Sequence, residues 1–151
     1  MQKNGYGMDT ASAICVADPT VWVAALFVDE LRAAGFNVIT EKESNSTSAL
    51  KIQGILLKLF AEPANSSVIE TDVHIKLIAS ESSGFVAKRS FFVKKSVINV
   101  WGTTNYFQTS IDNATRQIVK DMVSSIVNLL NRYPELSGKM PHTKYISLGE
   151  L

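Results

Sequence analysis

The chain has 151 residues, of which 46% are hydrophobic and 19% are charged. This length and hydrophobic content suit one globular domain with a proper core and argue against global disorder. Fifteen Lys and Arg against fourteen Asp and Glu leave a formal net charge of +1. Nucleic-acid binding requires clustered cations, and the one dense basic cluster, Lys88-Arg89 with Lys94-Lys95, falls within a predicted strand. We therefore expect no nucleic-acid partner.

The chain carries one cysteine, Cys15, so no intrachain disulfide can form. The stretch before Cys15 is polar and contains glycine, unlike a signal peptide or a lipoprotein acceptor site. We expect Cys15 to be a small buried apolar residue. The longest apolar run, Val21 to Val28, is far shorter than the roughly twenty residues that cross a bilayer.

The first predicted helix covers residues 19–34. Asp18 is a suitable N-cap, Pro19 suits the first helical position, and Gly35 provides the stop. Its apolar residues cover more than one stripe of the helix: Val21, Ala24, Leu26, Phe27, Val28, Leu31 and Ala34. Such a helix needs cover on two sides, which we expect from a sheet and from a partner subunit.

Five segments have the residue pattern of strands: Ala11–Ala17, Phe36–Thr40, Ala49–Phe60, Ser67–Ser80 and Phe85–Val97. The first two flank the helix closely, which favours a right-handed crossover. Apolar positions change phase at Gly54, and this predicts a β-bulge there. Residues 67–80 alternate strictly, so they indicate an antiparallel strand with one wet face.

A long closing helix is predicted over residues 111–131, with Ser110 as its N-cap. Apolar residues recur in it at three- and four-residue spacing. Residues 1–10 are expected to be a flexible N-terminus, residues 11–133 a single domain, and residues 134–151 an extended tail. The sequence thus predicts an α+β fold, in which a mainly antiparallel sheet of four to five strands carries two helices on one face, in the order strand, helix, four strands, helix.

Catalytic motifs are absent from the sequence: there is no nucleophile elbow, phosphate loop or dinucleotide fingerprint. Glu70, Asp72 and His74 fall on one strand face about 7 Å apart, where a weak divalent-metal site or a hydrolytic site is conceivable. A solvated sheet face explains them more simply. We therefore expect a non-enzymatic protein with no cofactor, no metal and no catalytic residues.

Two groups of apolar residues form the predicted interaction surface. One is the first helix, through Trp22, Leu26 and Phe27, and the other is the loop that leads into the closing helix, through Trp101, Tyr106 and Phe107. Aromatic residues on a loop with glycine can form a binding rim. The alternative is that they close the end of the core as a hydrophobic staple.

Three segments carry a resemblance to a known family. They are Val23-x-x-Leu26 with Leu31-x-x-Ala34-Gly35-Phe36-x-Val38, then Ala49-Leu50-x-Ile52-x-Gly54, then Phe107-x-x-Ser110-x-x-x-Ala114. Over residues 10–132 this progression resembles small periplasmic lipoproteins of Gram-negative bacteria, of the YajG type, and is similar to auxiliary lipoproteins of ABC transport systems for lipids. The resemblance implies a non-enzymatic α+β domain in the periplasm, tethered by lipid to the outer membrane.

The tether implied by that resemblance would lie in a segment preceding this sequence; alternatively the protein is a soluble relative. The leading hypothesis is a cell-envelope protein that assembles with itself or with a transport or secretion complex. The second is a carrier of a small molecule or lipid, with a cleft between helices and sheet. The third is an enzyme that uses Glu70, Asp72 and His74.

Overall fold

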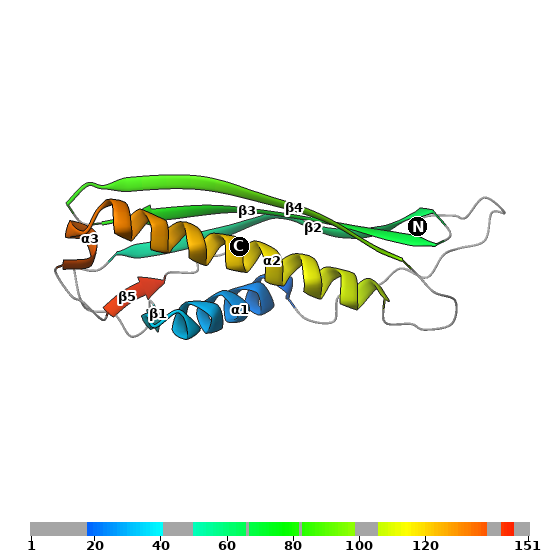
Figure 1. Ribbon diagram of the computed structural model, residues 1–151, viewed down its shortest axis with the longest axis horizontal. Helices are drawn as coiled ribbons and strands as arrows, with labels where there is room; N and C mark the ends of the chain where they lie inside the picture. The colour runs from blue at the N-terminus through cyan, green and yellow to red at the C-terminus, as the bar shows by residue number, and fades with distance from the viewer. Residues whose placement is uncertain are drawn as a thin grey trace.

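The structure is a computed structural model that describes residues 18–40, 50–65, 67–81, 83–98, 106–138 and 143–146. Its elements, in chain order, are α1 (Pro19–Ala33), β1 (Asn37–Thr40), β2 (Lys51–Asn65), β3 (Val68–Ser80), β4 (Val86–Ile98), α2 (Tyr106–Arg132), α3 (Glu135–Gly138) and β5 (Thr143–Ile146). The strands form one mixed sheet in the order β1-β5-β2-β3-β4 (Figure 1). The predicted α+β class is confirmed.

Helix α1 begins and ends where the sequence predicts, to within one residue. The Asp18 carboxylate accepts a hydrogen bond from the Thr20 backbone amide at 2.9 Å, which satisfies one of the free amides of the first turn. Ala34 caps the other end, and Gly35 follows with a φ of +88°, a conformation that favours glycine.

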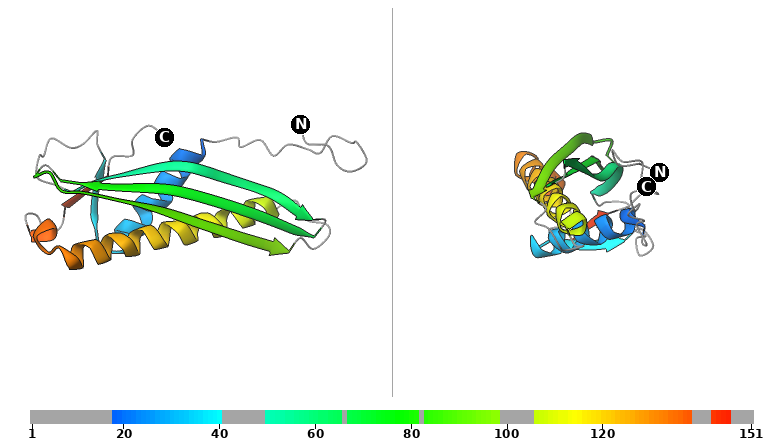
Figure 2. Two further views of the ribbon diagram at one scale, coloured as in Figure 1. Left: turned by 90° about the horizontal axis from the view of Figure 1, so that it is seen from above. Right: turned by 90° about the vertical axis from the view of Figure 1, so that its right-hand side faces the viewer.

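The two-sided cover of α1 comes from within the chain. One side contacts α2 and another contacts β1 and β2 (Figure 2). Phe27 and Leu31 are buried, and Trp22 and Leu26 are partly buried against the same core. Val21, in the first turn of α1, is 66% exposed. The second helix and the sheet therefore both cover α1, and the predicted partner subunit stays a prediction.

Strands β2, β3 and β4 form a long antiparallel meander. In β3 the predicted alternation is confirmed, because its inward residues Ile69, Thr71, Val73, Ile75, Leu77 and Ala79 are all buried. The predicted bulge at Gly54 is wrong: Gly54 pairs in register with Leu77, and the register shifts between Leu56 and Lys58. The extra residue is Leu57, which is therefore 52% exposed.

Helix α2 runs along the inner face of this meander (Figure 1). Its 27 residues span about 40 Å, close to the length of a 13-residue strand at about 3.3 Å per residue. The helix begins at Tyr106, so Ser110 is an interior residue and its predicted role as N-cap is wrong. The Ser110 hydroxyl is instead buried against β3, where it forms a hydrogen bond with Thr71.

The C-terminal segment contributes to the sheet. After the short helix α3, strand β5 runs parallel to β1 on one side and to β2 on the other. The segment predicted as an extended tail, residues 134–151, thus contains α3 and β5, and backbone pairing with two strands fixes β5. The strand expected at residues 11–17, Cys15 and the flexible residues 1–10 lie outside the described residues.

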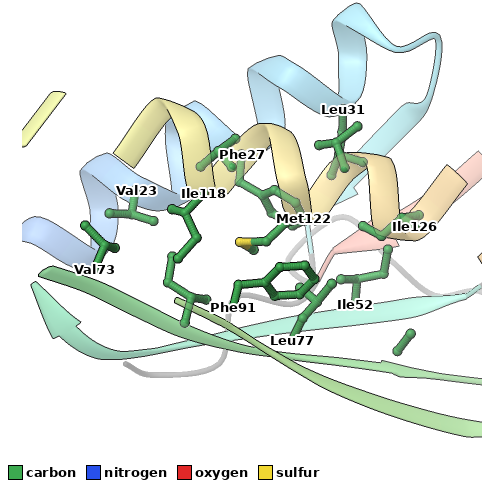
Figure 3. Packing of buried hydrophobic residues seen from close by; sticks show 14 of the residues in the cluster. Val23, Phe27, Leu31, Ile52, Val73, Leu77, Phe91, Ile118, Met122 and Ile126 are labelled. Carbon is green, nitrogen blue, oxygen red and sulfur yellow. The ribbon is translucent and has the colours of Figure 1, made fainter. Parts of the chain in front are cut away.

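The core lies between α2, α1 and the inner face of the sheet (Figure 3). Ile118, Met122 and Ile126 form the buried stripe of α2 at four-residue spacing. They meet Phe27 and Leu31 of α1 and, from the sheet, apolar side chains that include Ile52, Val73, Leu77 and Phe91. Because both helices lie on this side of the sheet, the opposite face of the meander carries no described helix (Figure 2).

Candidate interaction surface

The outer face of the meander is the most distinctive described surface. We use the term outer face for the outward side chains at its centre: Lys58, Phe60, Glu70, Asp72, His74, Phe92 and Lys94. Strand alternation fixes their direction, because each neighbours an inward residue in sequence. In β4, for example, Phe91 and Val93 are buried, so Phe92 between them points outward and is 60% exposed.

Cross-strand ion pairs fix the polar part of the outer face. Lys58 Nζ donates to Asp72 Oδ2 at 2.6 Å, and Lys94 Nζ lies 2.8 Å from Glu70 Oε2. The hydrogen bond from Lys58 holds the pKa of Asp72 below its usual value of 3.8, with Lys94 adding to the effect. The hydrogen bond with Glu70 and its charge raise the pKa of Lys94 above 10.5.

Two phenylalanines supply the apolar part. Phe60 is 45% exposed and sits opposite Asp72 in the register, and Phe92 sits opposite His74. The Phe92 and His74 rings meet edge to face at 6.2 Å between centroids, and Lys58 Nζ lies 5.8 Å from the Phe60 ring centroid. The outer face therefore combines exposed aromatic rings with charges of alternating sign.

The three residues considered for metal binding or hydrolysis lie on this face. Glu70 is paired with Lys94, Asp72 is paired with Lys58, and His74 contacts Phe92. Within the described residues, no group of three or more His, Cys, Asp or Glu side chains could hold a metal ion. Nothing in this arrangement joins the three residues into a reactive site.

The residues predicted as an interaction surface lie in different environments. Phe27 is 1% exposed and belongs to the core, whereas Trp22 and Leu26 are partly buried beside it. Tyr106 and Phe107 are partly buried in the first turn of α2. Trp101 lies outside the described residues, as does most of its loop.

Phe60 and Phe92 were absent from the predicted surface. For Phe92 a signal was present in the sequence: Phe91 and Phe92 are adjacent in a predicted strand, and adjacent strand residues point to opposite faces. With Phe91 in the core, Phe92 must face outward. For Phe60 the signal was the predicted change of phase in this strand, since a bulge before Leu59 turns Leu59 inward and Phe60 outward.

A groove lies on the other side of the sheet, between the second half of α2 and strands β3 and β4. Its volume is about 150 Å³. The apolar residues that line it are Leu77, Ala79, Ala87, Ile126 and Leu129, and the polar ones are Lys88, Arg89, Ser125, Asn128 and Arg132. This places a cleft between helix and sheet, the general position that a carrier would use.

No described helix is long and apolar enough to cross a membrane. No protein-family model and no curated protein sequence matches the chain. Among solved structures, the chain is similar to a minor lipoprotein from Acinetobacter baumannii, with 14% identity, a TM-score of 0.46, and coverage of 77% of this chain and 89% of that one. It is also similar to the rare lipoprotein B from Shewanella oneidensis, with 11% identity, a TM-score of 0.45, and coverage of 71% and 89%.

Proposed function

We propose that this protein is a non-enzymatic assembly component of the bacterial cell envelope and that it associates with a second copy of itself through the outer face. The observation that carries the self-association is the pair of exposed rings, Phe60 and Phe92, at the centre of a sheet face without a described covering element. Aromatic residues are enriched in protein interfaces and dominate their binding energy. The envelope location rests on the sequence resemblance to periplasmic lipoproteins.

The charges of the outer face favour a second copy as the occupant. Lys58, Asp72 and Lys94 alternate in sign across the three strands, with Glu70 beside Lys94. A two-fold interface places the same patch on both sides, so it requires a patch that complements itself. Alternating charges around two rings meet this requirement, because each cation of one copy can approach a carboxylate of the other.

The test is the mass of the protein in solution, measured by sedimentation equilibrium over a range of concentrations. We expect the wild type to form dimers and the Phe60→Ser/Phe92→Ser variant to be monomeric with an unchanged circular dichroism spectrum. Val21→Ser is the matched control, because Val21 is 66% exposed on α1 and away from the outer face. A wild type that stays monomeric at high concentration would refute the self-association.

The envelope location requires a separate measurement. Fractionation of cells that express the complete gene should recover the protein with the periplasm or the outer membrane. Recovery with the cytoplasmic fraction would overturn this part of the proposal and leave the self-association standing.

A carrier of a small molecule is the second candidate function. The groove between α2 and the sheet favours it, since ligand sites often form between packed elements and combine apolar walls with a few polar groups. The groove and the outer face lie on opposite sides of the sheet, so the two functions do not compete for one surface.

A further inference from the structure

Two small residues of the sheet leave room for the groove under α2. Ala79 of β3 and Ala87 of β4 are direct partners in the register and both face α2. Two methyl groups at adjacent positions leave space that larger side chains fill elsewhere in the sheet. Leu77 of β3 and the residues Ile126 and Leu129 of α2 complete its apolar lining. The floor of the groove is therefore apolar.

The polar residues around the groove are strongly biased toward positive charge. Arg89 and Arg132 line it, and no acidic residue does among those that the structure describes. Lys88 borders the groove, but its pairing with the outward residue Ile78 directs its side chain to the other side of the sheet. In the part of the chain that the structure describes, no carboxylate forms an ion pair with Arg89 or Arg132. The carbonyl groups at the C-terminal end of α2 contribute a partial negative charge of roughly half a unit, which offsets only part of the charge of the two arginines.

Arg89 is held in place within the groove. Its Nη1 donates to the Ser125 hydroxyl at 3.1 Å, and its guanidinium lies 5.5 Å from the Phe91 ring centroid. These contacts restrict the side chain, so less freedom is lost when it binds an anion. The remaining N–H groups of the fork are available to a carboxylate, which Arg can bind through two parallel hydrogen bonds.

We propose that this groove binds an amphiphilic carboxylate, with its head group at Arg89 and Arg132 and the adjoining carbons of its aliphatic stem on the Ala79–Ala87 floor. The volume of about 150 Å³ is below the roughly 300 Å³ of a typical site for a drug-sized ligand. The groove therefore takes the head group and the first carbons, and any longer chain would extend out of it. This proposal gives the carrier function a site and holds whether or not the outer face self-associates.

The experiment measures binding of four probes to the full chain by isothermal titration calorimetry: acetate, octanoate, dodecanoate and octylamine. Octanoate should bind at least about tenfold more tightly than acetate, which lacks the stem, and than octylamine, which lacks the negative charge. If dodecanoate binds more tightly than octanoate, the surface beside the groove also contacts the chain, which favours a long-chain carboxylate as the ligand class. Equal affinities for dodecanoate and octanoate favour a carboxylate with a chain no longer than that of octanoate, and both results support the site.

Variants locate the binding in the groove. Arg89→Gln and Arg132→Gln should each weaken octanoate binding on the order of tenfold, since each removes a charged hydrogen-bond donor. Arg116→Gln is the matched control, because Arg116 is exposed on α2 and does not line the groove. Ala87→Leu should fill the floor and reduce octanoate affinity to that of acetate, with folding checked by its thermal transition.

Three results would overturn the proposal. They are equal affinities for acetate and octanoate in the wild type, no binding of octanoate at millimolar concentration, or unchanged octanoate binding in the Arg89→Gln/Arg132→Gln double variant. None of these results bears on the dimer measurement, so the groove and the outer face fail or succeed separately.

Discussion

The hydroxyl oxygens of Thr71 and Ser110 lie 2.7 Å apart in the core and join the middle meander strand to α2. Both side chains are 0% exposed, so neither hydroxyl has access to water. We expect Thr71→Val and Ser110→Ala each to lower the free energy of unfolding by about 1–3 kcal/mol, because each leaves the other hydroxyl buried without a partner. The double variant should lose less than the sum of the two single losses. Urea denaturation of all four proteins checks this.

Thr115 provides the control for the two single variants and the double variant. Its hydroxyl is also buried on α2, but it has no hydrogen-bond partner among the described residues. Thr115→Val removes an unsatisfied group and keeps the branched shape, so stability should stay unchanged or rise. A Thr115→Val loss as large as that of Ser110→Ala would show that shape, and not hydrogen bonding, determines the cost at these sites.

Local sequence patterns predicted much of the described core. Helix α1 follows from a cap, a proline and a glycine close together in sequence, and the buried side of β3 follows from strict alternation. Both signals are local: they depend on neighbours within a few residues. The sheet strands Asn37–Thr40 and Val86–Ile98 were found for the same reason, with boundaries shifted by one residue.

The errors arose where distant residues decide the structure. Ser110 has the sequence features of a helix cap, yet its hydroxyl is satisfied by Thr71, 39 positions away, and the helix continues past it to Tyr106. Strand β5 is short and pairs in parallel with β1 and β2, so its place is set by partners far from it in the chain. The bulge in β2 falls at Leu57 and not at Gly54, because the pairing with β3 decides which residue is extra.

Ile118 tests the packing of α2 on the sheet. It is 0% exposed and lies between α1, α2 and the sheet, so Ile118→Asp buries a charge without a partner and should abolish folding. Lys120→Asp introduces the same side chain on the exposed side of the helix and should leave the protein folded. Circular dichroism and thermal melting separate the two. A soluble Ile118→Asp variant that melts cooperatively would contradict this packing.

The two glycines Gly35 and Gly54 should respond in opposite ways to alanine. Gly35 has a φ of +88°, so Gly35→Ala forces a strained backbone and should cost about 1–2 kcal/mol of unfolding free energy. Gly54 lies in β2 without a positive φ, and a Cβ there would have no atom within 4 Å. Gly54→Ala should therefore stabilise the protein by about 0.5–1 kcal/mol, through the lower entropy of the unfolded chain. Chemical denaturation of both variants measures the two signs.

The Lys58–Asp72 pair on the outer face predicts a dependence of stability on pH in acid. The hydrogen bond from Lys58 lowers the pKa of Asp72 below 3.8 in the folded protein. A group whose pKa is depressed on folding contributes stability that is present above its unfolded value and is lost as pH falls through the folded value. We therefore expect the wild type to lose this contribution below about pH 3.8. The contribution should be less than about 1 kcal/mol, since Lys58 is half exposed and screened by salt.

Two variants isolate that contribution. Asp72→Asn removes the titrating group, and Lys58→Met removes the donor that depresses its pKa. Each variant should be less stable than the wild type at neutral pH. Each difference in stability should shrink as pH falls below 3.8, because Asp72 of the wild type becomes protonated and loses its ion pair with Lys58. Denaturation midpoints from pH 7 to pH 2 measure this convergence. Differences that stay constant across the range would mean that the pair does not couple folding to protonation.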